Sequence, residues 1–177
     1  MRRRERRIAW ALFTLWCAWA YASTGFLGAV TPLGAWLPDL GLVLLLALGV
    51  HVAPGRLAWA ALIVALARIA FSVDPPVAVL AGYLGFAGLQ AVLRSFVNLE
   101  DPFARGALAG FAALLLDVWW SWVHAIRNPV LLDAPGTELA WRAALATAAC
   151  ALLFSELLLR LPGLRPLRRQ HFLGGRG

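Results

Sequence analysis

The stretch Leu40–Val50 reads LGLVLLLALGV, eleven consecutive residues without a polar or charged side chain. A transmembrane β-strand alternates apolar and polar residues, and this stretch shows no alternation. It lies within a mostly apolar run, Leu33–Ala53, which has the roughly 20 residues that a helix needs to cross the hydrocarbon of a bilayer. The stretch therefore predicts a membrane-spanning α-helix.

The composition of the whole chain agrees with this interpretation. Of its 177 residues, 62% are hydrophobic, against roughly 45–50% in an ordinary soluble domain. Only 14% are charged, whereas a water-soluble surface needs roughly a quarter to a third charged residues. With a mean hydropathy of +0.75, the chain is an integral membrane protein. Its length suits one membrane domain, residues 1–177, without room for a separate soluble catalytic module.

Six apolar stretches can be marked along the chain, and turn-forming residues such as Pro54-Gly55 and Asp74-Pro75-Pro76 separate them. Each is within the range of about 17–25 residues expected for a transmembrane helix. The expected fold class is an all-α bundle of six transmembrane helices. The predicted spans are Ile8–Val30, Leu33–Ala53, Leu57–Val73, Pro76–Val97, Gly106–Ile126 and Ala140–Leu161.

Arginine residues predict the orientation of these spans. With the N-terminus in the cytoplasm, thirteen Arg residues lie on the cytoplasmic side, Arg127 and Arg142 lie outside, and Arg68 lies within a span. This asymmetry follows the positive-inside rule, so we expect a multi-pass protein with both termini cytoplasmic. The cytoplasmic set is Arg2, Arg3, Arg4, Arg6, Arg7, Arg56, Arg94, Arg105, Arg160, Arg165, Arg168, Arg169 and Arg176.

The basic net charge of +7 does not indicate a nucleic-acid site, because the Arg residues do not form a continuous basic stripe. The N-terminal segment has an alternative interpretation. Met1–Ala22 carries a basic start, an apolar run and an Ala-Tyr-Ala sequence, as a signal peptide does. Because the apolar character continues past Ala22 to Val30, an uncleaved first span is favoured.

Ionisable residues within the spans need a partner, because charge is costly in hydrocarbon. Arg68 and Asp117 lie at equal depth in spans that run in the same direction, so we expect an ion pair between them, with Asp39 as the rival partner of Arg68. A proton or ion relay is the other interpretation. Because the only extension of such a relay is Ser121 and His124, a structural intramembrane pair is favoured.

Glycines predict close helix packing. Gly106 and Gly110 form a GxxxG sequence, which permits close approach of two membrane helices. Gly82 and Gly85, in the fourth span, are expected to act in the same way. The nine Trp residues lie largely near span ends, which is typical of an interfacial belt.

The sequence holds no catalytic constellation. It lacks a nucleophile elbow, a zinc-binding His-Glu-x-x-His sequence and a phosphate-binding loop, and it has no Lys. Cys17 and Cys150 lack neighbouring ligands at metal-binding spacing. We therefore expect no enzymatic activity, no cofactor and no metal.

Several local patterns resemble the bacterial rod-shape-determining MreD family. They are Pro38-Asp39-Leu40 before the Leu-rich second span, the basic turn at Gly55-Arg56, Leu114-Leu115-Leu116-Asp117-Val118 in the fifth span, the glycine-rich fourth span and the basic C-terminal tail. The chain departs from the family at Arg68, near which members often carry an acidic residue.

The resemblance implies a non-enzymatic subunit of the cell-elongation machinery in the bacterial inner membrane. Its expected partners are the bitopic protein MreC, MreB filaments, and the polymerase and transpeptidase of peptidoglycan synthesis, together with membrane lipid. The family fold is similar to the six-helix substrate-binding subunits of energy-coupling-factor transporters. This similarity supplies the alternative function, a membrane subunit that binds a vitamin or another small solute.

Overall fold

The structure, a computed structural model, describes residues 3–32, 34–127, 136–158 and 160–161. Every regular element in these ranges is helical, so the predicted all-α class is confirmed. The elements in chain order are α1 (Arg3–Val30), the 3₁₀ helix η1 (Gly34–Trp36), α2 (Leu40–Gly49), α3 (Pro54–Phe71), α4 (Pro76–Leu93), α5 (Pro102–Arg127) and α6 (Gly136–Leu158).

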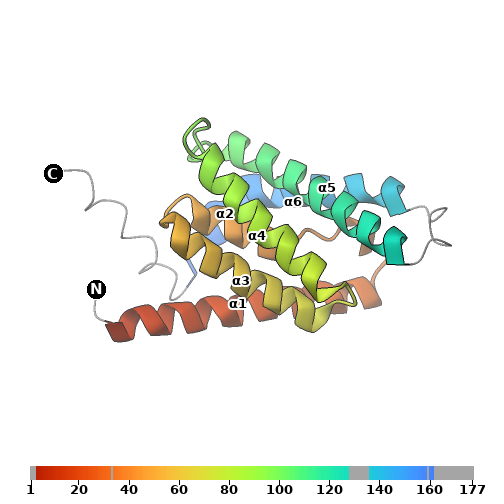
Figure 1. Cartoon of the computed structure of the whole chain (residues 1–177), viewed down its shortest axis with the longest axis horizontal. Helices are drawn as coiled ribbons and strands as arrows, with labels where there is room; N and C mark the ends of the chain where they lie inside the picture. The colour runs from red at the N-terminus through yellow and green to blue at the C-terminus, as the bar shows by residue number, and fades with distance from the viewer. Residues whose placement is uncertain (1–2, 33, 128–135, 159, 162–177) are drawn as a thin grey trace.

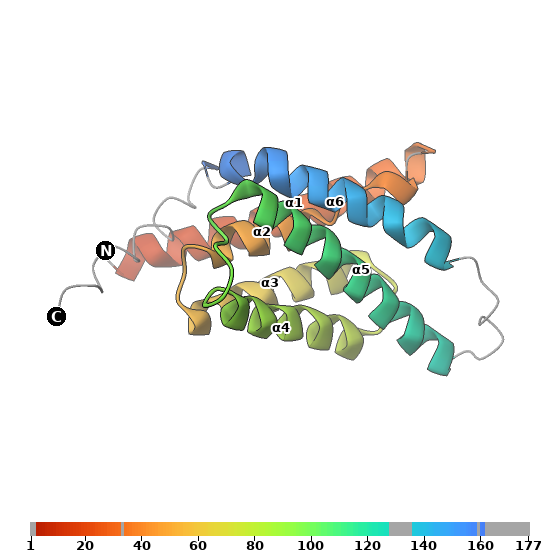
Figure 2. The same cartoon turned by 90° about the horizontal axis from the view of Figure 1, so that it is seen from above.

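Four of the described helices are long and apolar enough to cross a membrane: α3, α4, α5 and the part Ala140–Leu158 of α6. The long helices run back and forth, so that the start of α1 and the end of α6 lie at one end of the bundle (Figures 1 and 2). We call this the N-terminal end. The α1–α2 and α3–α4 connections lie at the other end, which we call the Asp74 end.

The predicted second span, Leu33–Ala53, is wrong as a continuous helix. Its α-helical part is α2, which has ten residues and rises about 15 Å, half of the roughly 30 Å of hydrocarbon. The helix begins after Pro38-Asp39 because the Asp39 side chain accepts the hydrogen bond of the Leu42 N–H, as an N-cap does. Residues 34–38, before Asp39, form η1 and irregular backbone.

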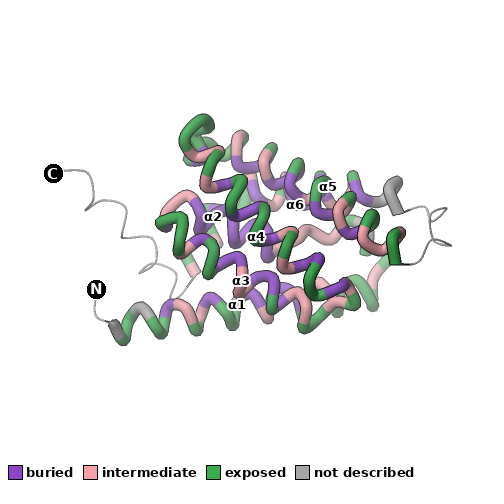
Figure 3. The backbone as a smooth tube through the Cα atoms, viewed as in Figure 1, coloured by how far each residue is buried: buried purple, intermediate pink, exposed green. Residues whose placement is uncertain are grey.

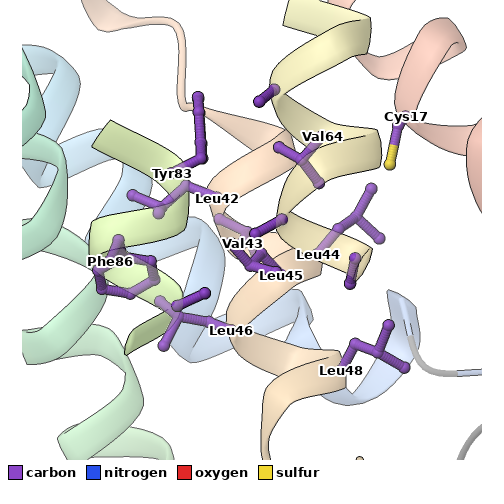
Figure 4. Packing of buried hydrophobic residues seen from close by; sticks show 14 of the residues in the cluster. Cys17, Leu42, Val43, Leu44, Leu45, Leu46, Leu48, Val64, Tyr83 and Phe86 are labelled. Carbon is purple, nitrogen blue, oxygen red and sulfur yellow. The ribbon is translucent and has the colours of Figure 1, made fainter. Parts of the chain in front are cut away.

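Helix α2 is the centre of the bundle. Every residue from Gly41 to Gly49 is buried, and α2 contacts α1, α3, α4, α5 and α6. Figure 3 shows the buried colour along α2, and Figure 4 shows its leucines between Val64 of α3 and Phe86 of α4. A helix that is apolar on every side is expected to be buried in this way.

The ends of the other helices differ from the predicted spans by a few residues. Helix α3 begins at Pro54 rather than Leu57, since proline is tolerated in the first turn of a helix. It ends at Phe71, before the Asp74-Pro75-Pro76 turn. Arg68 therefore lies in the last turn of α3, close to the Asp74 end, and not deep within a span.

Three of the four predicted packing glycines lie at helix contacts. A Cβ atom at Gly110 would lie 3.0 Å from the Ala148 Cβ of α6, and one at Gly106 would lie 3.2 Å from the Ala148 carbonyl oxygen. A Cβ atom at Gly82 would lie 2.8 Å from a Leu116 methyl group of α5. The prediction is wrong for Gly85 within this chain, because a Cβ atom there would meet no other part of the chain within 4 Å and Gly85 is exposed on α4.

Arg105 is buried, whereas the positive-inside rule counts it among the arginines on the cytoplasmic surface. Its side chain is 2% exposed, and its Nη1 lies 2.9 Å from the Glu156 carboxylate of α6. Its Nη2 donates to the Glu100 carbonyl oxygen. Arg105 therefore joins α5 to α6 near the N-terminal end. Several other Arg residues used for the orientation, Arg2, Arg165, Arg168, Arg169 and Arg176, lie outside the described residues.

Candidate functional site

Asp39, at the start of α2, forms hydrogen bonds with side chains of four other helices. Its Oδ1 accepts hydrogen bonds from the Leu42 N–H and the Tyr21 hydroxyl, both at 2.9 Å. Its Oδ2 accepts from Arg68 Nη1 at 3.1 Å and from the Tyr83 hydroxyl. The Asp39 N–H donates to Thr147 Oγ1 of α6 at 3.0 Å. One residue thus ties α1, α3, α4 and α6 to the start of the buried helix.

The sequence places Asp39 at this position for two physical reasons. Asp is among the preferred N-cap residues, because its side chain satisfies a backbone N–H that has no partner within the helix. A negative charge at a helix N-terminus is also stabilised by the helix dipole. The preceding Pro38 has no N–H, which helps the chain to leave helical geometry here. Asp39 therefore serves at once as the cap of α2 and as the acceptor for three neighbouring helices.

Arg68 links Asp39 to the α3–α4 connection. Its Nη2 and Nε donate to Asp74 Oδ2 at 3.1 and 3.3 Å, while Nη1 contacts Asp39. The guanidinium carbon lies 3.7 Å from the centre of the Trp120 ring, within the range of a cation–π interaction. The other oxygen of Asp74 lies 3.3 Å from His124 Nε2 of α5. Polar contacts therefore run continuously from the start of α2 through α3 to α5.

The predicted rival pair, Arg68–Asp39, is confirmed, and the preferred pair, Arg68–Asp117, is wrong. Asp117 forms no ion pair with any described residue and lines the cavity beside Arg68. The depth argument fails because it ignores what lies between the two helices. Trp120 of α5 covers the face of the guanidinium, and Asp39 and Asp74 take its N–H donors.

A cavity of about 290 Å³ lies over this cluster at the Asp74 end. Its polar side chains come from α1, the start of α2, α3, α5 and α6, while Phe71 and Trp120 supply aromatic surface. The volume is near the lower limit for small-molecule sites, roughly 300 Å³. The charged lining groups of the cavity are Asp39 and Arg68, which already pair with each other, and Asp117. The polar lining residues are Tyr21, Thr24, Asp39, Arg68, Ser72, Asp117 and Thr147.

The described residues do not form a metal site, since no three of their His, Cys, Asp and Glu side chains gather closely enough to hold an ion. The relay considered from the sequence, Asp117-Ser121-His124, does not form a line either. His124 contacts Asp74, whereas Ser121 is exposed. The arrangement fits a fixed network of charges more closely than a path for protons.

Sequence reasoning missed four residues of this network. Tyr21 and Tyr83, whose hydroxyl groups lie 2.8 Å apart, are not predicted from the sequence to contact Asp39. The sequence indicates Asp74 only as part of a turn, and Trp120 only as part of an interfacial belt. The available signal was the position of Asp74 six residues after Arg68, directly beyond the end of α3.

Comparisons of this chain with protein-family models, with curated proteins and with solved structures give no match.

Proposed function

We propose that this chain is a non-enzymatic scaffold of the bacterial cytoplasmic membrane that holds cell-elongation proteins together. The resemblance to the MreD family motivates the proposal. Its partners are then MreC, MreB filaments and the peptidoglycan polymerase and transpeptidase. In this proposal both termini are cytoplasmic, and η1 with α2 completes the second of six crossings.

One structural observation supports a docking role for α4. Five small or β-branched residues follow one another along its exposed face at helical spacing. A Cβ atom at Gly85 or Gly88 would meet no other part of the chain within 4 Å. In lipid, small residues allow two helix backbones to approach closely, and this contact drives helix association. A partner helix with a small-residue face, such as that of a bitopic protein, fits this stripe. The α4 stripe consists of Val77, Ala81, Gly85, Gly88 and Val92.

Copurification from native membranes tests the scaffold. The tagged chain should recover cell-wall synthesis proteins, and Ala81→Leu should reduce their recovery at least severalfold. Ala107→Leu is the matched control, because Ala107 is also an exposed helical alanine, on α5. Equal recovery with both variants would contradict docking on α4. Depletion of the chain in a rod-shaped host should give rounded cells.

The cavity beside Asp39 supports a second candidate, a substrate-binding subunit of a small-solute transporter. It opens among polar groups of several helices, as solute sites in membrane bundles do. If this function holds, copurification should recover an ATPase and a coupling subunit, and depleted cells should lose uptake of a vitamin while they keep their shape. These results would replace the scaffold proposal.

A further inference from the structure

A second cavity, of about 1010 Å³, lies between α1 and α3 at the N-terminal end of the bundle. Two arginines line it, Arg7 near the start of α1 and Arg56 near the start of α3. The rest of its lining is apolar or aromatic, and Trp59 and Leu66 are exposed. The cavity is therefore an open groove on the side of the bundle, which we call the α1–α3 groove. Its apolar lining is Trp10, Trp59, Leu62, Ile63 and Leu66.

The α1–α3 groove has a charged end and an apolar length. From Arg56 to Leu66 the helix advances ten residues, or about 15 Å at 1.5 Å per residue. This distance is half of the roughly 30 Å of hydrocarbon in a bilayer, which is the depth of one leaflet. Trp10 and Trp59 lie near the charged end, where Trp is commonly found at the level of lipid headgroups.

The two arginines are available to an anion. Neither Arg7 nor Arg56 forms an ion pair with an acidic side chain of the described residues. The guanidinium group matches phosphate oxygens in a two-pronged geometry, and two such groups at one end of a groove concentrate positive charge there. A small soluble anion would contact only the two arginines and would not contact the apolar residues that line the rest of the groove.

We propose that the α1–α3 groove binds an anionic phospholipid. The phosphate lies between Arg7 and Arg56, and an acyl chain follows Trp59, Leu62 and Leu66 along α3. In the orientation proposed above, the lipid belongs to the cytoplasmic leaflet, where anionic lipids attract basic residues. The binding itself does not depend on the scaffold function.

Native mass spectrometry of the purified full chain tests the charged end. Phosphatidylglycerol and phosphatidylcholine with identical acyl chains are offered at equal concentration, with inorganic phosphate in a separate sample. We expect one phosphatidylglycerol to be retained about tenfold more strongly than phosphatidylcholine, since two basic residues act on its charge. The double variant Arg7→Gln/Arg56→Gln should lose this preference. The control Arg4→Gln/Arg160→Gln removes the same charge from exposed positions outside the groove and should keep it.

A second pair of variants tests whether an acyl chain contacts the apolar residues of the groove. Leu66→Asn should weaken phosphatidylglycerol binding severalfold, whereas Leu153→Asn, at an exposed leucine of α6, should not. Melting temperatures establish that all variants are folded. Equal retention of the two lipids, equal loss in the control double variant, or saturation of the arginines by inorganic phosphate alone would each overturn the proposal.

Discussion

The guanidinium of Arg68 lies 3.7 Å from the centre of the Trp120 ring, so that α5 covers the cation that joins Asp39 to Asp74. These contacts involve the donor edges and one face of the guanidinium. Its edges donate to two carboxylates, and one face rests on an indole. Arg68 therefore connects the start of α2, the end of α3 and the C-terminal half of α5.

Removal of Arg68 should destabilise the bundle. Arg68→Leu leaves the carboxylates of Asp39 and Asp74 without their cation, and we expect a loss of about 2–3 kcal/mol, since hydrogen bonds to charged groups are of this size. Thermal unfolding in detergent measures the effect. Arg127→Leu, at an exposed arginine of α5, is the control and should stay within about 0.5 kcal/mol of the wild type. Similar melting temperatures for both variants would contradict the role of Arg68.

The two carboxylates that line the Asp39 cavity should differ in their effect on stability. Asp39→Ala removes the N-cap of α2, worth about 1 kcal/mol, together with the acceptor of Tyr21, Tyr83 and Arg68. Asp117→Ala removes a side chain that has no ion pair among the described residues and should change the free energy of unfolding by about 0.5 kcal/mol or less. An equal loss in the two variants would show that Asp117 belongs to the network.

Two glycines of neighbouring helices should respond in opposite ways to a methyl group. Gly110→Ala should destabilise by about 1–3 kcal/mol, because its Cβ would lie 3.0 Å from Ala148 of α6. Gly85→Ala meets open space and should be neutral or more stable by up to about 1 kcal/mol, since alanine favours the helix. Detergent-solubilised yield and melting temperature measure both. A destabilised Gly85→Ala variant would indicate a contact of α4 that the single chain lacks.

The orientation can be measured with alkaline-phosphatase fusions. Fusions after Asp74 and after Thr137 should be active, because the positive-inside rule places both positions outside the cell. Fusions after Asn98 and after Arg169 should be inactive. The reverse pattern would invert the bundle and would place the Asp39 cavity on the cytoplasmic side.

The sequence predicts the helices of this chain better than the contacts between them. Long apolar runs such as Pro76–Val97 locate helices well, since length and hydropathy are local properties. The same reasoning fails for Leu33–Ala53. The average hydropathy of this run is that of a full span, but Pro38 and Asp39 interrupt the helix. Two or three residues determine an N-cap, and their effect is lost when hydropathy is averaged over about 20 residues.

Of the contacts of Arg68, the sequence predicts the one with Asp39 but not those with Asp74 and Trp120. Counting residues along a helix gives the depth of a side chain but not its distance from other helices. Asp117 has a suitable depth, yet Asp39 and Asp74 lie closer, because one starts the central helix and the other follows α3 directly. Such lateral distances follow from the packing of the whole bundle.

The short central helix has a consequence for the order in which the chain assembles. A ten-residue helix is too short to rest in lipid alone, because the irregular backbone before it would lack hydrogen-bond partners in hydrocarbon. One of those partners, Thr147, belongs to α6, the last helix that the structure describes. Thr147, which accepts the hydrogen bond of the Asp39 N–H, lies 108 residues after Asp39, so it has not yet been synthesised when α2 is complete. The buried centre of this protein is therefore completed last, after synthesis of α6.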